Sequence, residues 1–365
     1  MRVAIKHEFL NVDRTGHVIG HDAGDTLVRR LLRLFPGAHL IGARGQRFPD
    51  LDIVPLEMVD AGQTLIINMD VVDSVTVWRG CRTLTERPRV MNFLWWDVNR
   101  YDNPVEKAAL ALSCALFPTF TNSERTSRAT ADMVRRWTVK PLADRARISG
   151  VNLGIRLEHV QPRDEPDIPV VLYPAIYVSE RKQPNQFIDI VTAVAQRTPI
   201  RVEARLSGAH LASEPAMRLA RQPWASVGPI VPSRADYWQA LAHTTAFLAT
   251  AAEESYGLEY VEALVAGAVG IFPDRDWAHA LVPADYPFFY RTPAEAEDLL
   301  ERAVTDTAAC RQALDGAADG DFIGWLRDRH DDDNFEAAIA EHVMRWFGPV
   351  TVASTQTGHS SPSAA

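Results

Sequence analysis

Residues 254–273 read Glu-Ser-Tyr-Gly-Leu-Glu-Tyr-Val-Glu-Ala-Leu-Val-Ala-Gly-Ala-Val-Gly-Ile-Phe-Pro. A carboxylate, a glycine turn, a helix and a strand follow one another closely in this stretch. Gly257 offers a turn from which a helix can begin with its free backbone N–H groups facing a ligand, and such donors suit a diphosphate. Apolar residues recur at helical spacing from Leu258, Gly267 closes the helix, and a buried strand starts at Val269. The stretch predicts a nucleotide-sugar site.

The same stretch resembles the signature of retaining glycosyltransferases of the GT-B fold, in particular family 4. That signature is Glu-Gly-Phe-Gly-Leu-x-x-x-Glu-Ala, followed by a small residue, Gly and an apolar strand. The positions that fit it are Glu254, Tyr256, Gly257, Leu258, Glu262, Ala263 and Gly267. The positions that depart from it are Ser255 for the first glycine, Thr250 and Ala251 for a Pro-Ser pair, and Val269 for proline. These departures are typical of a distant member.

The resemblance implies roles for individual residues of the stretch. Glu254 is expected to contact hydroxyls of the donor sugar, and Glu262 to bind the ribose of the nucleotide. The remaining nucleotide-binding positions that it implies are Ser255, Tyr256, Gly257 and Leu258. The alternative is ordinary helix chemistry, because carboxylates favour the positive end of a helix dipole.

A basic segment precedes another predicted helix; it reads Ser179-Glu180-Arg181-Lys182-Gln183-Pro184. It occupies the place of the family's Gly-Arg-x-x-x-x-Lys-Gly loop, whose basic side chains neutralise the donor diphosphate. Lys182 fits this loop well, whereas strict spacing would put the family arginine near Tyr177, which leaves Arg181 as a neighbouring candidate. A departing nucleoside diphosphate concentrates negative charge that Lys or Arg can stabilise without a metal. In isolation the segment would instead be interpreted as a solvated charged turn.

Composition limits the class of protein. A chain of 365 residues is too long for one ordinary hydrophobic core, which predicts two domains. Its 47% hydrophobic and 23% charged residues are typical of a globular protein. A net charge of −9 argues against a general nucleic-acid binder. Three widely spaced cysteines and no apolar run long enough for a signal peptide or membrane span predict a cytoplasmic location, at most peripheral to a membrane.

Strands alternate with helices along the whole chain, which predicts parallel sheets. The expected architecture is α/β of the GT-B type, with two Rossmann-like domains facing each other across a cleft. We expect an N-terminal acceptor-binding domain at residues 1–160 and a nucleotide-sugar-binding domain at residues 161–333. The helix at residues 334–347 is expected to cross back to the first domain, and residues 351–365 are rich in Ser, Thr, Gly and Ala and predict a disordered tail.

The first domain should supply the acceptor site from loops at the carboxyl ends of its strands. Candidates are the loop at residues 11–25, with His17, His21 and Asp22, and the segment at residues 95–100. The family often has a polar group after the corresponding strand, pointing at the transferring sugar, and Asp97 takes that position here. The paired tryptophans of this segment could stack on a sugar or belong to the core, and His21 could equally stabilise its loop.

Residues 125–147 form a basic segment in an acidic chain; its members are Arg125, Arg128, Arg135, Arg136, Lys140, Arg145 and Arg147. It could contact a phosphorylated lipid, a membrane surface or nucleic acid, or it could be a solvated helical face. Asp331-Asp332-Asp333 is better explained as a helix cap than as a metal site. We therefore expect no metal and no cofactor apart from the donor substrate.

The predicted function is transfer of a hexose from a nucleotide diphosphate sugar to a hydroxyl acceptor, with retention of configuration. The acceptor class stays open among glycan, lipid-linked and other hydroxyl acceptors. Alternatives are a phage-type DNA-modifying glucosyltransferase, a non-catalytic GT-B scaffold that binds a nucleotide or glycan, and a sugar-nucleotide epimerase. Sequence signatures of dehydrogenases, P-loop NTPases and serine hydrolases are absent from the chain.

Overall fold

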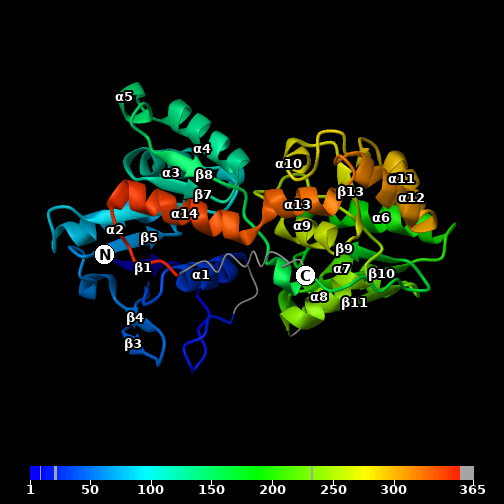
Figure 1. The fold of residues 1–365 in the computed structure, drawn as a ribbon, viewed down its shortest axis with the longest axis horizontal. Helices are drawn as coiled ribbons and strands as arrows, with labels where there is room; N and C mark the ends of the chain where they lie inside the picture. The colour runs from blue at the N-terminus through cyan, green and yellow to red at the C-terminus, as the bar shows by residue number, and fades with distance from the viewer. Residues whose placement is uncertain (9, 20–22, 232, 354–365) are drawn as a thin grey trace, which may run out of the picture. The chain divides into compact units, whose positions relative to one another are not determined.

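The computed structural model describes residues 1–8, 10–19, 23–231 and 233–353 (Figure 1). The chain divides into two compact units, each built around its own sheet. The first unit comprises Met1–Asn152 and the chain from Asp333 onward, and the second comprises Leu153–Asp332. Residues 354–365 of the predicted tail lie outside the described residues, whereas the backbone N–H of Ala353 donates to the carbonyl of Leu34 at 2.9 Å.

The first unit contains an eight-stranded sheet in the order β3-β4-β2-β1-β5-β6-β7-β8. Its strands are β1 (Arg2–Lys6), β2 (His39–Ile41), β3 (Gln46–Arg47), β4 (Asp52–Val54), β5 (Thr64–Asn68), β6 (Arg89–Leu94), β7 (Thr119–Thr121) and β8 (Ile148–Gly150). The edge pair β3–β4 is antiparallel, and the other pairs are parallel. β5 has the bounds that its apolar run predicts, because a strand buried on both faces reads as continuous hydrophobic sequence.

The helices of this unit are α1 (Ala23–Leu34), α2 (Ser74–Arg82), α3 (Pro104–Leu116), α4 (Glu124–Trp137), α5 (Lys140–Ala143) and α14 (Asp332–Phe347), with short turns η1 (Leu56–Met58), η2 (Val71–Asp73) and η3 (Val98–Arg100). Ser123 caps α4, since its hydroxyl accepts from the backbone N–H of Thr126 at 3.0 Å. In α14, the buried ring of Phe335 packs against Phe93 of β6 and Phe120 of β7. The last helix therefore completes the core of the first unit.

The second unit contains a six-stranded parallel sheet in the order β11-β10-β9-β12-β13-β14. Its strands are β9 (Val170–Tyr173), β10 (Arg201–Leu206), β11 (Ala225–Pro229), β12 (Ala246–Leu248), β13 (Val269–Pro273) and β14 (Phe289–Tyr290). The order reverses between β9 and β12, because β9 leads outward to β10 on one side while β12 leads to β13 on the other. Ligands of open parallel sheets bind beyond the carboxyl ends of the strands at such a switch point.

The helices of this unit are α6 (Pro184–Ala195), α7 (Glu214–Ala220), α8 (Arg234–Ala242), α9 (Leu258–Val265), α10 (Asp276–His279), α11 (Pro293–Thr305), α12 (Thr307–Gly316) and α13 (Phe322–His330), with η4 (Leu157–His159), η5 (Glu180–Lys182) and η6 (Gly208–His210). Right-handed crossovers in opposite directions put α6 and α7 on one face of the sheet and α8 and α9 on the other.

The polar, proline-rich residues 162–169 are anchored on the second unit. The guanidinium of Arg163 donates to the carbonyls of Leu241, Thr244 and Ala266, at 3.3, 2.6 and 3.3 Å. At the boundary of this unit, the N–H of Ile155 donates to the carbonyl of His330 at 2.8 Å. These bonds hold both ends of the unit's chain against its core.

Candidate functional site

Two loops meet at the switch point of the second sheet. One follows β9 and contains η5, and the other follows β12 and leads to α9. The N–H of Ala252 donates to the carbonyl of Arg181 at 2.8 Å, and the hydroxyl of Thr250 donates to the carbonyl of Lys182 at 2.7 Å. The backbone of the basic loop is thus fixed directly against the loop that carries Glu254.

The side chains of the two loops form a charged cluster. The ammonium of Lys182 lies 2.5 Å from Glu254 Oε1 and 3.6 Å from Glu259 Oε2. The hydroxyl of Tyr260 donates to the same oxygen of Glu254 at 2.9 Å, and the ammonium of Lys182 lies 5.5 Å from the centre of its ring. The side chains of Lys182 and Glu254 are only 16% and 13% exposed. The sequence predicted both residues but not their direct contact.

The carboxylates of this cluster favour the charged form of Lys182. Desolvation alone would lower the pKa of Lys182, but Tyr260, Glu254 and Glu259 outweigh it and raise that pKa well above its ordinary value. Burial raises the pKa of Glu259; Lys182 opposes this rise, and the carboxylates of Glu254 and Glu262 add to it. The cluster therefore holds a permanent cation at the switch point, surrounded by carboxylates.

Gly257 sets the direction of α9. Its φ is +96°, and a Cβ at this position would lie 2.6 Å from Cδ2 of Tyr260, so both the backbone and the close packing require glycine. α9 starts at Leu258, as the sequence predicts, and its N-cap residue Gly257 makes no side-chain hydrogen bond to the helix. The first N–H groups of a helix have no acceptor within the helix, and here no capping side chain supplies one. They lie at the positive end of its dipole, next to the Lys182 loop.

Glu262 lies inside α9 and is 3% exposed. The guanidinium of Arg234 donates to Oε1 at 2.6 Å, and the hydroxyl of Tyr237 donates to Oε2 at 2.7 Å. Burial raises the pKa of Tyr237 well above its ordinary value, with a contribution from Glu262, so its hydroxyl stays protonated and donates. Each carboxylate oxygen can accept a further hydrogen bond. Glu262 is thus fixed in position while keeping acceptor capacity.

Tyr256 is buried, and its hydroxyl bonds to Nδ1 of His330 at 2.6 Å. The other ring nitrogen of His330 lies 2.9 Å from the carbonyl of Leu281. Because a carbonyl only accepts, Nε2 carries the proton and Nδ1 accepts from Tyr256. This bond ties the Glu254 loop to the end of α13. It gives Tyr256 a structural role in addition to the nucleotide-binding role that the sequence predicts.

Two other predicted residues flank the cluster. Ser255 lies half-buried in the Glu254 loop, and the side chain of Arg181 is exposed. No ion pair of Arg181 is found among the described residues. Of the two basic candidates, Lys182 is the one that the structure brings to Glu254.

The predicted acceptor residues belong to the first unit. Asp97 caps η3, since its side chain accepts from the N–H of Asn99 at 2.9 Å. The rings of Trp95 and Trp96 pack edge to face, with their centroids 5.7 Å apart. His17 is 75% exposed, and its Nδ1 lies 2.7 Å from the hydroxyl of Thr15. His21 and Asp22 lie outside the described residues.

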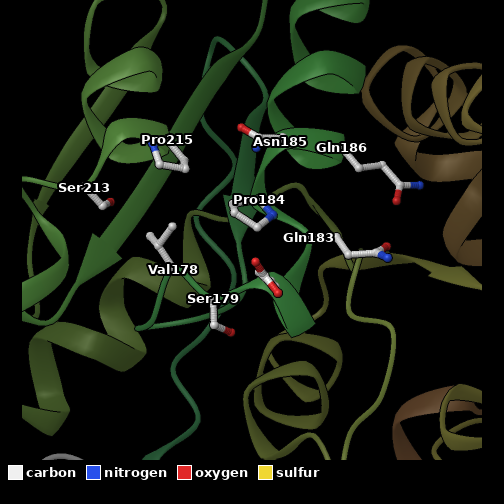
Figure 2. Close-up of a pocket in the computed structure, with 9 residues that line it drawn as sticks. Val178, Ser179, Gln183, Pro184, Asn185, Gln186, Ser213 and Pro215 are labelled. Atoms are coloured by element: carbon white, nitrogen blue, oxygen red, sulfur yellow. The ribbon is translucent and has the colours of Figure 1, made fainter.

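A hollow of about 520 Å³ adjoins the basic loop on the side of α6 and α7. Its lining residues are Val178, Ser179, Glu180, Gln183, Pro184, Asn185, Gln186, Ser213 and Pro215. Figure 2 shows Ser213 and Pro215 on one side, Gln183 and Gln186 on the other, and Pro184 between them. No lining residue is basic and one is acidic, so the hollow does not suit a diphosphate.

The described residues contain neither a candidate metal cluster nor a candidate membrane-spanning helix. No group of three or more His, Cys, Asp or Glu in that part of the chain could hold a metal ion. Within the same residues, no helix is both long enough and apolar enough to cross a membrane. Of the three consecutive aspartates, Asp331 forms a parallel bridge with Ile155, and the N–H of Asp332 donates to the carbonyl of Ile155 at 3.1 Å.

Four members of the site were missed from the sequence: Glu259, Tyr260, Arg234 and Tyr237. Glu259 and Tyr260 lie inside the signature stretch, but its pattern leaves their positions unspecified. Arg234 and Tyr237 stand one turn apart at the start of α8, after the capping Ser233. Their spacing could have suggested a common face. Nothing in the sequence pointed from that face to Glu262.

Comparison with known proteins identifies the fold. No protein-family model and no curated protein sequence matches the chain. Among solved structures, sucrose-phosphate synthase from Thermosynechococcus elongatus is similar with a TM-score of 0.69 and 10% identity, over 95% of this chain and 99% of that one. Trehalose-6-phosphate synthase OtsA has a TM-score of 0.67 and 10% identity, over 97% and 100%. Anabaena HepE in complex with UDP and glucose has a TM-score of 0.67 and 12% identity, over 94% and 99%.

These similarities extend over nearly the whole of each chain, so they include both units. The protein has the GT-B fold, with two Rossmann-like domains, as the signature stretch predicts. At 10–12% identity, the similarity shows the fold alone.

Proposed function

We propose that the protein transfers a hexose from a UDP-sugar to a hydroxyl acceptor, with retention of configuration. The observation that carries the proposal is the Lys182–Glu254 pair at the switch point, beside the uncapped start of α9. The choice of UDP is supported by the similar structures, one of which contains UDP-glucose and another of which is described as UDP-forming. Neither a metal nor a separate cofactor forms part of the proposal.

The leaving diphosphate needs positive charge. The ammonium of Lys182 and the N–H groups of Leu258 and Glu259 would stabilise it as the bond to the sugar lengthens. Because Glu254 and Glu259 raise the pKa of Lys182, this cation persists at neutral pH. Donor binding would bring the phosphate next to an ammonium that already has a fixed direction. Such preorganisation avoids the cost of orienting the cation during the reaction.

The two glutamates would bind opposite ends of the donor. Glu254 would accept hydrogen bonds from hydroxyls of the sugar, and Tyr260 and Lys182 hold its carboxylate in a fixed orientation. Glu262 would accept from the ribose hydroxyls with the capacity that Arg234 and Tyr237 leave on its two oxygens. Glu254 lies in the loop before α9, and Glu262 lies about one turn inside this helix, so the two carboxylates would meet different parts of the donor.

The reaction requires no enzyme nucleophile in this mechanism. The bond between the anomeric carbon and the phosphate oxygen breaks, and the acceptor hydroxyl attacks the same face of the sugar. Its proton passes to an oxygen of the leaving phosphate, so atoms and charges balance. The acceptor would bind to the first unit, where Asp97 remains a candidate contact. Exclusion of water from the site would limit hydrolysis of the donor.

The test is incubation of the purified protein with UDP-glucose and a panel of sugar and lipid-linked alcohols. We expect acceptor-dependent release of UDP and a product with the anomeric configuration of the donor, read from its NMR coupling constant. Glu254→Gln should lower kcat, whereas Glu203→Gln should not, because Glu203 lies on β10 and pairs with Arg205 at 3.7 Å. Inversion of configuration would overturn the mechanism, and UDP binding without turnover of any acceptor would indicate a non-catalytic scaffold.

A further inference from the structure

Apolar side chains are exposed where α3 and α4 end. Leu112 and Leu116 of α3 are 38% and 45% exposed, Trp137 at the end of α4 is 37% exposed, and Val139 in the following turn is 63% exposed. Leu112 and Leu116 are four residues apart and lie on one face of α3. Each of these side chains gives up the favourable burial that apolar groups normally find in a core.

The chain topology brings these residues to one edge of the first unit. α3 and α4 each connect neighbouring parallel strands, so both run opposite to the strands and end at the same edge of the sheet. α5 packs against both helices, with Leu142 and Ala143 turned toward the core that includes Cys114 and Val134. Figure 1 shows α5 beyond the end of α4, at the margin of this unit. We call Leu112, Leu116 and residues 135–140 the α3–α5 corner.

The α3–α5 corner is basic. The charged residues within 135–140 are Arg135, Arg136 and Lys140, all of them cationic, in a chain whose net charge is −9. Arg135, Arg136 and Lys140 are exposed, and they flank Trp137 and Val139 in the sequence. Arg135 pairs with Asp132, and Lys140 lies 2.9 Å from Asp144. Exposed pairs of this kind contribute little, so these cations can turn toward another anionic surface.

We infer that the α3–α5 corner docks the protein on an anionic lipid surface. Basic side chains would contact the headgroups while Trp137, Val139 and the leucines enter the interfacial layer. The exposed apolar residues select this partner, because a nucleic acid would need the basic side chains alone. The corner lies at the edge opposite the carboxyl ends of the strands, so docking leaves the loops at those ends accessible. This inference does not depend on the proposed sugar transfer.

The experiment is co-sedimentation of the full chain with vesicles of phosphatidylcholine alone or mixed with phosphatidylglycerol, in low and high salt. The wild type should bind the mixed vesicles in low salt, and binding should weaken with salt and without the anionic lipid. Each basic residue near a lipid surface changes binding about fivefold. R135E/R136E should therefore bind mixed vesicles at least twenty-fold more weakly.

Two further variants sharpen the test. V139D removes an apolar contact at the most exposed position and should also weaken binding without unfolding the protein, which circular dichroism checks. M217A/R221E is the matched control, because Met217 and Arg221 are an exposed apolar and an exposed basic residue of the second unit. Equal binding by wild type and R135E/R136E would overturn the inference. Loss with R135E/R136E but not with V139D, or binding to duplex DNA instead of vesicles, would also overturn it.

Discussion

Lys182 is the cation that pairs with two carboxylates in the site. Its ammonium compensates the carboxylates of Glu254 and Glu259 in a poorly hydrated position. Removing one partner of a buried pair leaves an uncompensated charge, which typically costs about 3–5 kcal/mol. We expect Lys182→Met to lower the free energy of unfolding by an amount of this order, measured by denaturant titration. Lys182→Met/Glu254→Gln should recover part of the loss, since both charges are then absent.

The control for Lys182 is Lys140→Met. The partner of Lys140 is Asp144, and their side chains are 84% and 58% exposed. Solvent screens this pair, so its loss should change stability by less than about 1 kcal/mol. If Lys182→Met is no more destabilising than Lys140→Met, the cluster has no special electrostatic role.

The sequence predicted Lys182, Glu254 and Glu262 because they stand at signature positions. It could not predict which residues hold them. Tyr237 and Glu262 are 25 residues apart, and Tyr256 and His330 are 74 apart. Their contacts depend on how α8, α9 and α13 pack, which hydrophobic periodicity leaves open. Arg181 shows the same limit, because sequence alone could not distinguish its exposed side chain from that of Lys182.

At the scale of elements, the start of α9 depends on Gly257. We expect Gly257→Ala to destabilise the protein by about 1–3 kcal/mol, because alanine disfavours the positive φ. Its Cβ would also push the ring of Tyr260, whose hydroxyl bonds to Glu254, so kcat should fall with stability. The measurements are denaturant titration and turnover of the donor.

Gly320 provides the matched comparison for this effect. Its φ is +98°, nearly that of Gly257, and nothing lies within 4 Å of its would-be Cβ. Gly320→Ala therefore carries the backbone strain without the contact. It should be destabilising yet leave kcat unchanged. Equal losses of turnover in both variants would contradict a role for the Tyr260 contact.

The bounds of strands and helices could be predicted well where the local sequence pattern alone determines them. Strands β5 and β9 have the bounds that their apolar runs indicate, and α9 begins at the residue after its glycine. Which strands pair with one another was harder to predict, because sheet order depends on crossovers between segments far apart in sequence. Chain length indicated two domains, but only the resemblance to a known family supplied their GT-B architecture.

At the scale of the whole molecule, His330 couples stability to pH. Burial lowers its pKa from the ordinary 6.5 to about 4. The unfolded chain therefore binds more protons than the folded chain between these values, and the free energy of unfolding falls as pH drops from about 6.5 to 4. The contribution is about 3 kcal/mol. The measurement is denaturant titration from pH 7 to pH 4.

Two variants isolate this contribution from that of the carboxylates. His330→Gln cannot gain a proton on unfolding, so its stability should depend less on pH over the same window. His17→Gln should behave as the wild type, because His17 is exposed. A wild type and a His330→Gln variant with the same pH dependence would show that His330 does not titrate as its burial requires.

The most direct test of the nucleotide-sugar site is a calorimetric titration of UDP onto wild type, Glu262→Ala and Glu203→Ala. Hydrogen bonds to a charged group contribute about 1.5–3 kcal/mol, so loss of the ribose contacts should weaken affinity at least tenfold. We predict saturable UDP binding to the wild type, at least tenfold weaker binding to Glu262→Ala and unchanged binding to Glu203→Ala. No UDP binding by the wild type, or equal affinity in all three proteins, would contradict the account.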